Sequence, residues 1–93
     1  MYLGIDLGTS GVKIVLTNTS GDIVDSSSSS FEVSRPHPLW SEQNPRDWWI
    51  GFCDAMDKLS INHDLSQVLG LGLSGQMHGA TLLDENDQVI RPA

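Results

Sequence analysis

The chain has 93 residues, of which 39% are hydrophobic and 18% are charged, so its composition is that of one small globular domain. Its 12 acidic residues against 5 basic ones give a net charge of −7, which argues against a nucleic-acid or anionic-membrane surface, since both require a basic face. Because Cys53 is the only cysteine, an intramolecular disulfide is excluded. We recognise no secretory leader and no membrane-spanning run, and we expect a cytoplasmic protein.

The first third of the chain predicts three strands joined by short turns. An apolar strand at residues 2–5 ends in Asp6, and residues 7–11 form a turn that contains two glycines. A second strand follows at residues 12–17 and a second turn at residues 18–22, and a third strand runs from Ile23 toward Val33. This order predicts an antiparallel meander. Five consecutive serines at residues 26–30 are poor strand material, which favours a solvated edge strand or a loop there.

A helix of about 15 residues is predicted after an irregular, proline-containing loop at residues 35–39. Asn44 can cap the helix, Pro45 suits its first position, and Asp47 suits the positive end of its dipole. Cys53 lies in this apolar stretch and is expected to be a buried, inert thiol. Helical spacing puts four large apolar residues on one face, namely Trp48, Phe52, Met56 and Leu59.

The last third of the chain predicts further strands. After a break at residues 62–66, the apolar run at residues 68–73 predicts a buried strand, parallel to the first sheet, with Leu69, Leu71 and Leu73 on one face. A turn at residues 74–79, a strand at residues 80–83 and a polar hairpin loop at residues 84–88 follow, before Val89 and Ile90. The fold class is therefore α/β with a mixed sheet.

The segment at residues 4–13 is the main candidate for chemistry. An apolar strand presents Asp6 at its end, and the turn that follows offers backbone amides, two hydroxyls and two glycines, which suit a phosphate group. Asp6 could hold Mg²⁺ through its carboxylate oxygens. The alternative is an ordinary hairpin with a surface aspartate. The glycine pattern at residues 70–75 is not a dinucleotide-binding motif, because its first two glycines lie inside the strand and no helical pattern follows.

A second candidate is the loop at residues 74–79. Gln76 and His78 could hydrogen-bond a polyol beyond the end of a buried strand, or the loop could be a plain connection. His37, His63 and His78 show no metal-ligand spacing. Trp40, in the loop before the helix, could line a cleft.

Three segments together resemble one family. Residues 4–13 resemble the first phosphate-binding hairpin of sugar kinases in the actin-like ATPase superfamily, and residues 38–45 with Trp48 and Trp49 resemble the segment after the third strand in that family. Residues 74–80 are similar to members of the FGGY carbohydrate kinases that act on xylulose. The resemblance implies a partial actin-like (ribonuclease H-like) domain. On this basis residues 1–93 are the N-terminal part of the first of two domains.

The resemblance also implies an activity and its residues. The full-length enzyme would phosphorylate D-xylulose to D-xylulose 5-phosphate with ATP and Mg²⁺, with ribulose, gluconate or glycerol as alternative acceptors. Asp6 would be the catalytic and metal-binding carboxylate. The remaining assignments are Gly8, Thr9, Ser10, Gly11 and Lys13 for ATP phosphates, and Gln76, Met77 and His78 for the sugar.

The family's catalytic base lies beyond Ala93, so the 93-residue chain is expected to be inactive alone. A sheet cut within a domain leaves open edges, which predicts self-association of the chain, and the full enzyme could be a homodimer. Two other readings stay open at this point: a small acidic module that binds a phosphorylated ligand, and a purely structural or interaction domain.

Overall fold

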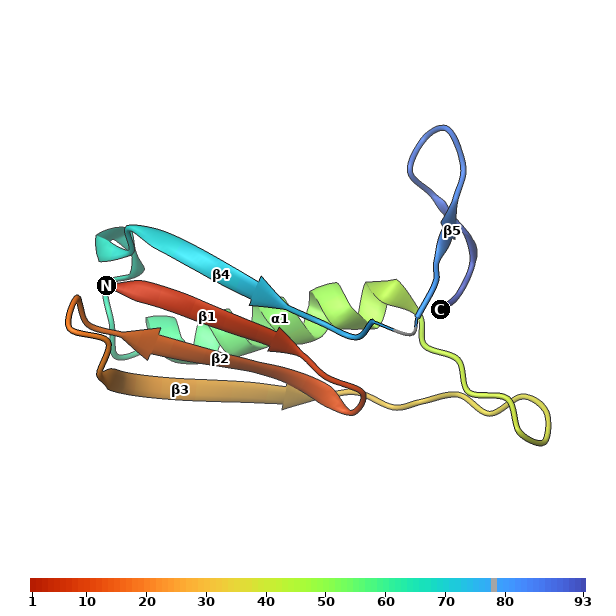
Figure 1. The fold of residues 1–93 in the computed structure, drawn as a ribbon, viewed down its shortest axis with the longest axis horizontal. Coiled ribbons are helices and arrows are strands. Elements are labelled where there is room, and N and C mark those ends of the chain that lie inside the picture. The colour runs from red at the N-terminus through yellow and green to blue at the C-terminus, as the bar shows by residue number, and fades with distance from the viewer. Residues whose placement is uncertain (78) are drawn as a thin grey trace.

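The computed structural model describes residues 1–77 and 79–93, which form a four-stranded sheet, one long helix and a separate small hairpin (Figure 1). The sheet has the order β3-β2-β1-β4. In chain order, the elements of the whole structure are β1 (Tyr2–Leu7), β2 (Gly11–Thr17), β3 (Ile23–Ser30), α1 (Pro45–Ser60), the 3₁₀ turn η1 (Leu65–Gln67), β4 (Gly70–Ser74), β5 (Leu82–Leu83) and β6 (Val89–Arg91).

The first three strands form the predicted antiparallel meander. The β2–β3 turn is closed by Asn18, whose Oδ1 accepts hydrogen bonds from the backbone N–H groups of Ser20 and Asp22 at 3.0 Å each. Gly21 takes a φ of +87° in this turn, a conformation that favours glycine. The third strand ends at Ser30 rather than near Val33, because the chain leaves the sheet there for the loop that leads to α1.

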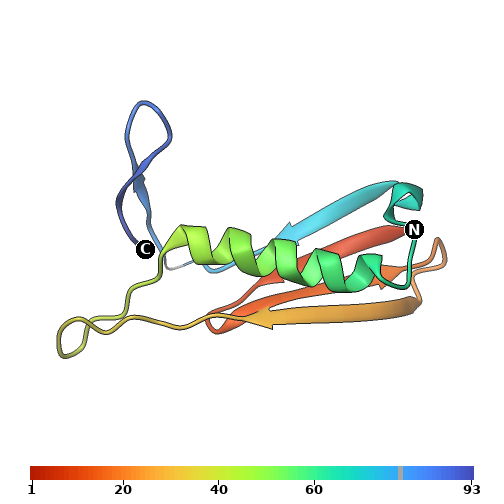
Figure 2. The same cartoon turned by 180° about the vertical axis from the view of Figure 1, so that it is seen from behind.

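Helix α1 begins as the sequence predicts and lies across one face of the sheet (Figure 2). The side chain of Asn44 accepts a hydrogen bond from the Arg46 N–H at 3.0 Å, and Pro45 is the first helical residue. The most deeply buried face differs from the predicted one. It is formed by small residues and one leucine, namely Gly51, Ala55 and Leu59, while Trp48, Phe52 and Met56 are only partly buried beside it.

The core lies between α1 and one face of the meander. Alternate residues of β1 and β2 point toward the helix, and the buried apolar set is Leu3, Ile5, Val12, Ile14, Leu16, Ala55 and Leu59. Cys53 is partly buried, not fully buried as predicted, because it lies two positions from both Gly51 and Ala55 and so points away from the row that faces the sheet.

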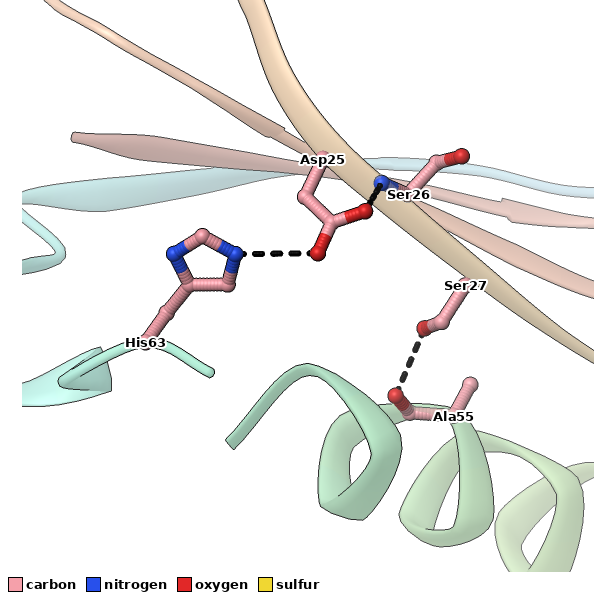
Figure 3. A network of polar contacts seen from close by, with 5 residues as sticks. All are labelled: Asp25, Ser26, Ser27, Ala55 and His63. Atoms are coloured by element: carbon pink, nitrogen blue, oxygen red, sulfur yellow. Dashed lines mark hydrogen bonds and ion pairs between the residues drawn. The ribbon is translucent and has the colours of Figure 1, made fainter. Parts of the chain in front are cut away.

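The serine run forms the edge strand β3, one of the two arrangements expected for it. The side chains of Ser27 and Ser29 are half-buried toward α1, whereas Ser26, Ser28 and Ser30 are exposed. The Ser27 hydroxyl donates a hydrogen bond to the Ala55 carbonyl oxygen at 2.6 Å (Figure 3). Small hydroxyl side chains therefore let the helix backbone approach the strand and satisfy one of its carbonyls.

A second contact holds the chain after α1 against the same strand. His63 Nε2 lies 2.9 Å from Asp25 Oδ2, and Asp25 Oδ1 accepts a hydrogen bond from the Ser26 N–H (Figure 3). The hydrogen bond from His63 and the one from the Ser26 N–H lower the pKa of Asp25.

Strand β4 pairs with β1 in the predicted parallel direction, with Ile5 beside Leu73. The predicted burial of its leucines is wrong: Leu71 is 62% exposed, Leu73 is 75% exposed, and Leu69 is exposed just before the strand. The reason is that α1 packs on β2 and β3 and leaves this edge of the sheet uncovered. In the described part of the chain, no helix is long and apolar enough to cross a membrane.

The final segment forms the predicted hairpin with shorter strands. Only Leu82–Leu83 and Val89–Arg91 pair, and the hairpin projects away from the four-stranded sheet in Figure 1.

Candidate functional site

Three polar side chains form one row across the sheet, on the face opposite α1. Asp6 is paired with Lys13 of β2 on one side and with Ser74 of β4 on the other. Because side chains alternate along a strand, Asp6 points away from α1, while its neighbours Ile5 and Leu7 face the helix side. Asp6 and Lys13 are both exposed, and no ion pair within 4.0 Å joins them among the described residues. The row therefore offers a carboxylate, an ammonium group and a hydroxyl to a ligand.

The turn between β1 and β2 lies directly beyond this row. The Gly8 N–H donates to the Gly11 carbonyl oxygen at 2.9 Å, and Thr9 and Ser10 are exposed at the tip. Asp6, Gly8, Ser10, Gly11 and Lys13 line one side of an open pocket of about 570 Å³, and residues 28–30 of β3 with Asp54 and Lys58 of α1 line its other side. The structure thus brings together the predicted phosphate-binding residues, with Thr9 at the tip on the side of a second pocket.

Gly11 also has a structural role. A Cβ atom built on it would lie 2.5 Å from the carbonyl oxygen of Ser29 and 3.1 Å from the Cα of Ser30. The close approach of β3 therefore requires a glycine here, independently of any ligand.

Behind the turn lies a residue that the sequence analysis did not select, Gln43. Its side chain is only 9% exposed, and its Nε2 donates to the Thr9 carbonyl oxygen. Its Oε1 accepts two hydrogen bonds, from Trp48 Nε1 at 3.1 Å and from Gln76 Nε2 at 3.0 Å. The backbone of Gln43 is also held, because its N–H and C=O groups exchange hydrogen bonds of 2.8 and 2.9 Å with Ala93.

Gln43 was missed because a single glutamine in a proline-containing loop carries no local pattern. The signal that could point to it is its place in the segment 38–45, which carries part of the family resemblance.

The loop after β4 meets the same turn through Gln76. Gln76 Nε2 donates to the Gly8 carbonyl oxygen at 3.0 Å, in addition to its bond with Gln43. Met77 is 85% exposed, and His78 lies outside the described residues. Of Gln76 and Met77, the two predicted sugar-binding residues that the structure describes, Gln76 hydrogen-bonds to the turn.

Trp40 lies away from the turn, in the loop before α1. Its ring packs against His37 at a centroid distance of 4.6 Å, and the Arg91 guanidinium lies 5.7 Å from its ring centre. Arg91 in turn pairs with Glu42. Trp40 is 48% exposed and is not among the residues that line the pockets described here. These contacts tie the β5–β6 hairpin to that loop.

The residues that could hold a metal ion are few. Among the described residues, no group of three or more histidine, cysteine, aspartate or glutamate side chains lies together. Asp6 is the one carboxylate in the row with Lys13 and Ser74. Mg²⁺ is commonly held by one or two carboxylates plus substrate phosphates and water, so a single exposed carboxylate beside a phosphate-binding turn fits this ion.

Comparison with known proteins identifies the family. Residues 1–93 match the family described as "FGGY family of carbohydrate kinases, N-terminal domain". The chain belongs to this family. Over all 93 residues it is 58% identical to a xylulose kinase of Klebsiella pneumoniae and 56% identical to one of Escherichia coli (strain K12).

The fold is shared as well. A crystal structure described as a "xyloylose kinase" from Brucella ovis superimposes with a TM-score of 0.94 at 50% identity, covering 98% of this chain and 20% of that one. The meander, the helix and the parallel β4 are therefore those of the N-terminal domain of FGGY kinases. The chain spans 19% of the length of the two curated relatives.

Proposed function

We propose that residues 1–93 are the N-terminal part of the first actin-like domain of an ATP-dependent kinase that converts D-xylulose to D-xylulose 5-phosphate. One observation supports this proposal. The row of Asp6, Lys13 and Ser74, the turn at residues 8–11 and the loop after β4 lie together at one end of the sheet. In such a reaction the terminal hydroxyl oxygen of the sugar bonds to the γ-phosphorus, and the bond from that phosphorus to ADP breaks. The proposal includes a cytoplasmic location, where ATP is supplied.

The turn and Lys13 would bind the phosphates of ATP. Backbone amides in a tight turn can bind an anion despite the acidic net charge of the chain, because their partial positive charges act at short range. Gly8, Thr9, Ser10 and Gly11 would contribute their backbone or hydroxyl groups. The ammonium group of Lys13, in the row beside Asp6, would neutralise phosphate charge.

Asp6 would hold Mg²⁺ and orient the phosphoryl group. When bound, the ion supplies positive charge to the transferring phosphate oxygens. Met77 and His78 would contact the sugar, and Gln76 would be a weaker contact, since both N–H groups of its amide are already used.

The proposed mechanism also needs a group that takes the proton from the attacking hydroxyl. We expect that base, an aspartate, outside these 93 residues. Transfer needs donor, metal, acceptor and base held together, so the purified 93-residue chain should show no kinase activity. ATP-dependent phosphorylation of xylulose by this chain alone would contradict that expectation.

The test of the proposed function is a coupled kinase assay on the full-length gene product with Mg-ATP. D-xylulose should be phosphorylated faster than ribulose, gluconate or glycerol, and Asp6→Asn should lower kcat by about 100-fold or more. The matched control is Asp57→Asn, which changes an exposed carboxylate on the outer face of α1 in the same way. Turnover with another polyol would correct the substrate, and no turnover with any of them would favour a phosphate-binding module.

Self-association of the 93-residue chain is part of the same proposal. The edge of β4 is unpaired and carries the exposed Leu71 and Leu73. Its free backbone N–H and C=O groups can therefore pair with a strand of a second copy. Sedimentation should show dimers or larger species, and replacing Leu73 by lysine should shift the chain toward monomer. A monodisperse monomer at high concentration would argue against this. We expect a homodimer for the full-length enzyme, which sedimentation of that protein tests separately.

A further inference from the structure

Two carbonyl groups of the turn at residues 8–11 accept hydrogen bonds from glutamine side chains. The Gly8 carbonyl oxygen accepts from Gln76 Nε2 at 3.0 Å, and the Thr9 carbonyl oxygen accepts from Gln43 Nε2. Both glutamines come from segments far away in the sequence, separated from the turn by 34 and 68 residues. Consecutive peptide groups of the turn are therefore held from one side by two side-chain amides.

The orientation of these peptides decides what the turn shows to a ligand. In a trans peptide the C=O group and the following N–H group point in opposite directions. Because the carbonyls of Gly8 and Thr9 point toward the glutamines, the N–H groups of Thr9 and Ser10 point away from them. Neither N–H group has a hydrogen-bond acceptor among the described residues. Two adjacent amide donors are thus left to bind an anion.

The glutamine pair is itself firmly held. Gln43 is 9% exposed, its Oε1 accepts from both Trp48 and Gln76, and its backbone pairs with Ala93. Both N–H groups of the Gln76 amide are used, one by the Gly8 carbonyl and one by Gln43. A glutamine amide can accept at its oxygen and donate at its nitrogen at once, which an apolar or a carboxylate side chain cannot do.

We propose that Gln43 and Gln76 are positioning residues that fix the peptide orientation of the turn, so that the Thr9 and Ser10 amides face a phosphate group of the nucleotide. This inference deepens the proposed function and rests on it for the identity of the phosphate-bearing ligand. Gln76 then acts mainly through the turn, and not as a direct contact to the sugar.

The experiment measures ATP affinity by equilibrium titration of the full-length protein, with no sugar present. Gln43→Met keeps the size of the side chain but removes the donor, and it should raise the Kd for ATP at least tenfold. At pH 8 Gln43→Glu should bind ATP as weakly as Gln43→Met or more weakly, because a carboxylate cannot donate a hydrogen bond to the Thr9 carbonyl. The matched control pair is Gln88→Met and Gln88→Glu in the distal hairpin, which should leave the Kd within threefold of the unsubstituted protein.

A pH series separates a hydrogen-bond donor from a space-filling side chain. In Gln43→Glu, burial raises the pKa of the new carboxyl group, whereas hydrogen bonds from Trp48 Nε1 and Gln76 Nε2 to its oxygen lower it, so the pH at which it gains a proton is first measured by titration. The protonated carboxyl can donate to the Thr9 carbonyl, whereas Met cannot, although both are uncharged. Below the pH at which its carboxyl group gains a proton, Gln43→Glu should therefore bind ATP at least threefold more tightly than Gln43→Met at the same pH.

The outcomes are distinct. An ATP Kd for Gln43→Met within threefold of the unsubstituted protein, or equal affinities of Gln43→Glu and Gln43→Met once the carboxyl group is protonated, would overturn the inference. Absence of any ATP binding by the unsubstituted protein would overturn it as well. If Gln43→Met does not fold, as judged by thermal unfolding, Gln76→Met makes the same test from an exposed position. A protein that binds ATP in a Gln43-dependent way but phosphorylates no sugar would support the inference and refute the proposed function.

Discussion

Strands β2 and β4 flank β1 on opposite sides, and both carry alternating apolar residues on the face where α1 lies. The burial of these residues differs between the two strands: Leu16 of β2 is 0% exposed, whereas Leu73 of β4 is 75% exposed. The difference comes from the covering element, because α1 packs on β2 and β3 and not on the β4 edge. Alternation along a strand thus predicts which way a side chain points, while burial depends on whether another element covers that face.

The uncovered part of this face is a groove. Side chains of α1 and β4 line an open apolar space of about 370 Å³, with Trp48, Trp49 and Phe52 on one side and Leu71 and Leu73 on the other. The two regions should therefore respond very differently to the loss of the same apolar atoms.

The largest expected effect is the truncation of Leu16 to alanine. Leu16 is fully buried in the core, so Leu16→Ala should lower the free energy of unfolding by about 3 kcal/mol through lost apolar burial and the cavity left behind. The matched substitution Leu73→Ala should cost less than about 0.5 kcal/mol, because its side chain is already in water. Urea unfolding of both variants, at a concentration where the 93-residue chain is monomeric, measures the two values. Equal losses would mean that β4 is covered in solution and that Leu16 and Leu73 do not differ in burial.

A substitution at Gly11 tests the meander in a second way. Gly11→Ala should destabilise the chain by about 1–3 kcal/mol, because the new methyl group would overlap the Ser29 carbonyl oxygen and force β2 and β3 apart. Gly4→Ala is the matched control, since a Cβ atom at Gly4 meets nothing within 4 Å. Chemical unfolding should show no loss for Gly4→Ala, and an undisturbed Gly11→Ala variant would contradict the close approach of the strands.

The elements predicted well from the sequence are those set by local chemistry. Asn44 and Pro45 mark the start of α1 through capping and a fixed φ, and both features depend only on neighbouring residues. The turn at Gly21 is local in the same sense. For the candidate site, the sequence was sufficient to bring Asp6 and Lys13 together, because a short turn fixes which residues pair across a hairpin.

The elements predicted poorly depend on contacts between distant segments. The buried face of α1 runs through Gly51 and Ala55, small residues that hydrophobicity patterns overlook but that let the helix approach β2 and β3 closely. Gln43 could not be recognised as part of the site, because its partners Thr9, Trp48 and Gln76 meet only after the chain has folded.

A smaller effect is expected from the contact between the serine strand and the helix. Ser27→Ala removes the hydrogen bond to the Ala55 carbonyl oxygen and should lower the free energy of unfolding by about 1 kcal/mol. Ser28→Ala is the control, because the Ser28 side chain is exposed on the other face of the same strand. If both variants unfold at the same urea concentration, the Ser27 hydroxyl contributes nothing and the small size of the serines is what matters.

The smallest expected effect concerns the half-buried pair of Asp25 and His63, at the end of the sheet away from the candidate site. The hydrogen bonds from His63 and from the Ser26 N–H lower the pKa of Asp25 in the folded chain. The unfolded chain therefore binds more protons at this carboxyl, so the contribution to stability is complete above the ordinary pKa of an aspartate and is lost as the pH falls through the lowered value. Asp25→Asn should consequently lower the thermal unfolding midpoint slightly at pH 6, with the difference from the unsubstituted chain shrinking below about pH 4. Asp22→Asn is the control, because it changes an exposed carboxylate of the neighbouring turn in the same way. A difference that stays constant from pH 6 to pH 3 would show that the carboxylate charge has no part in holding the segment after α1 against β3.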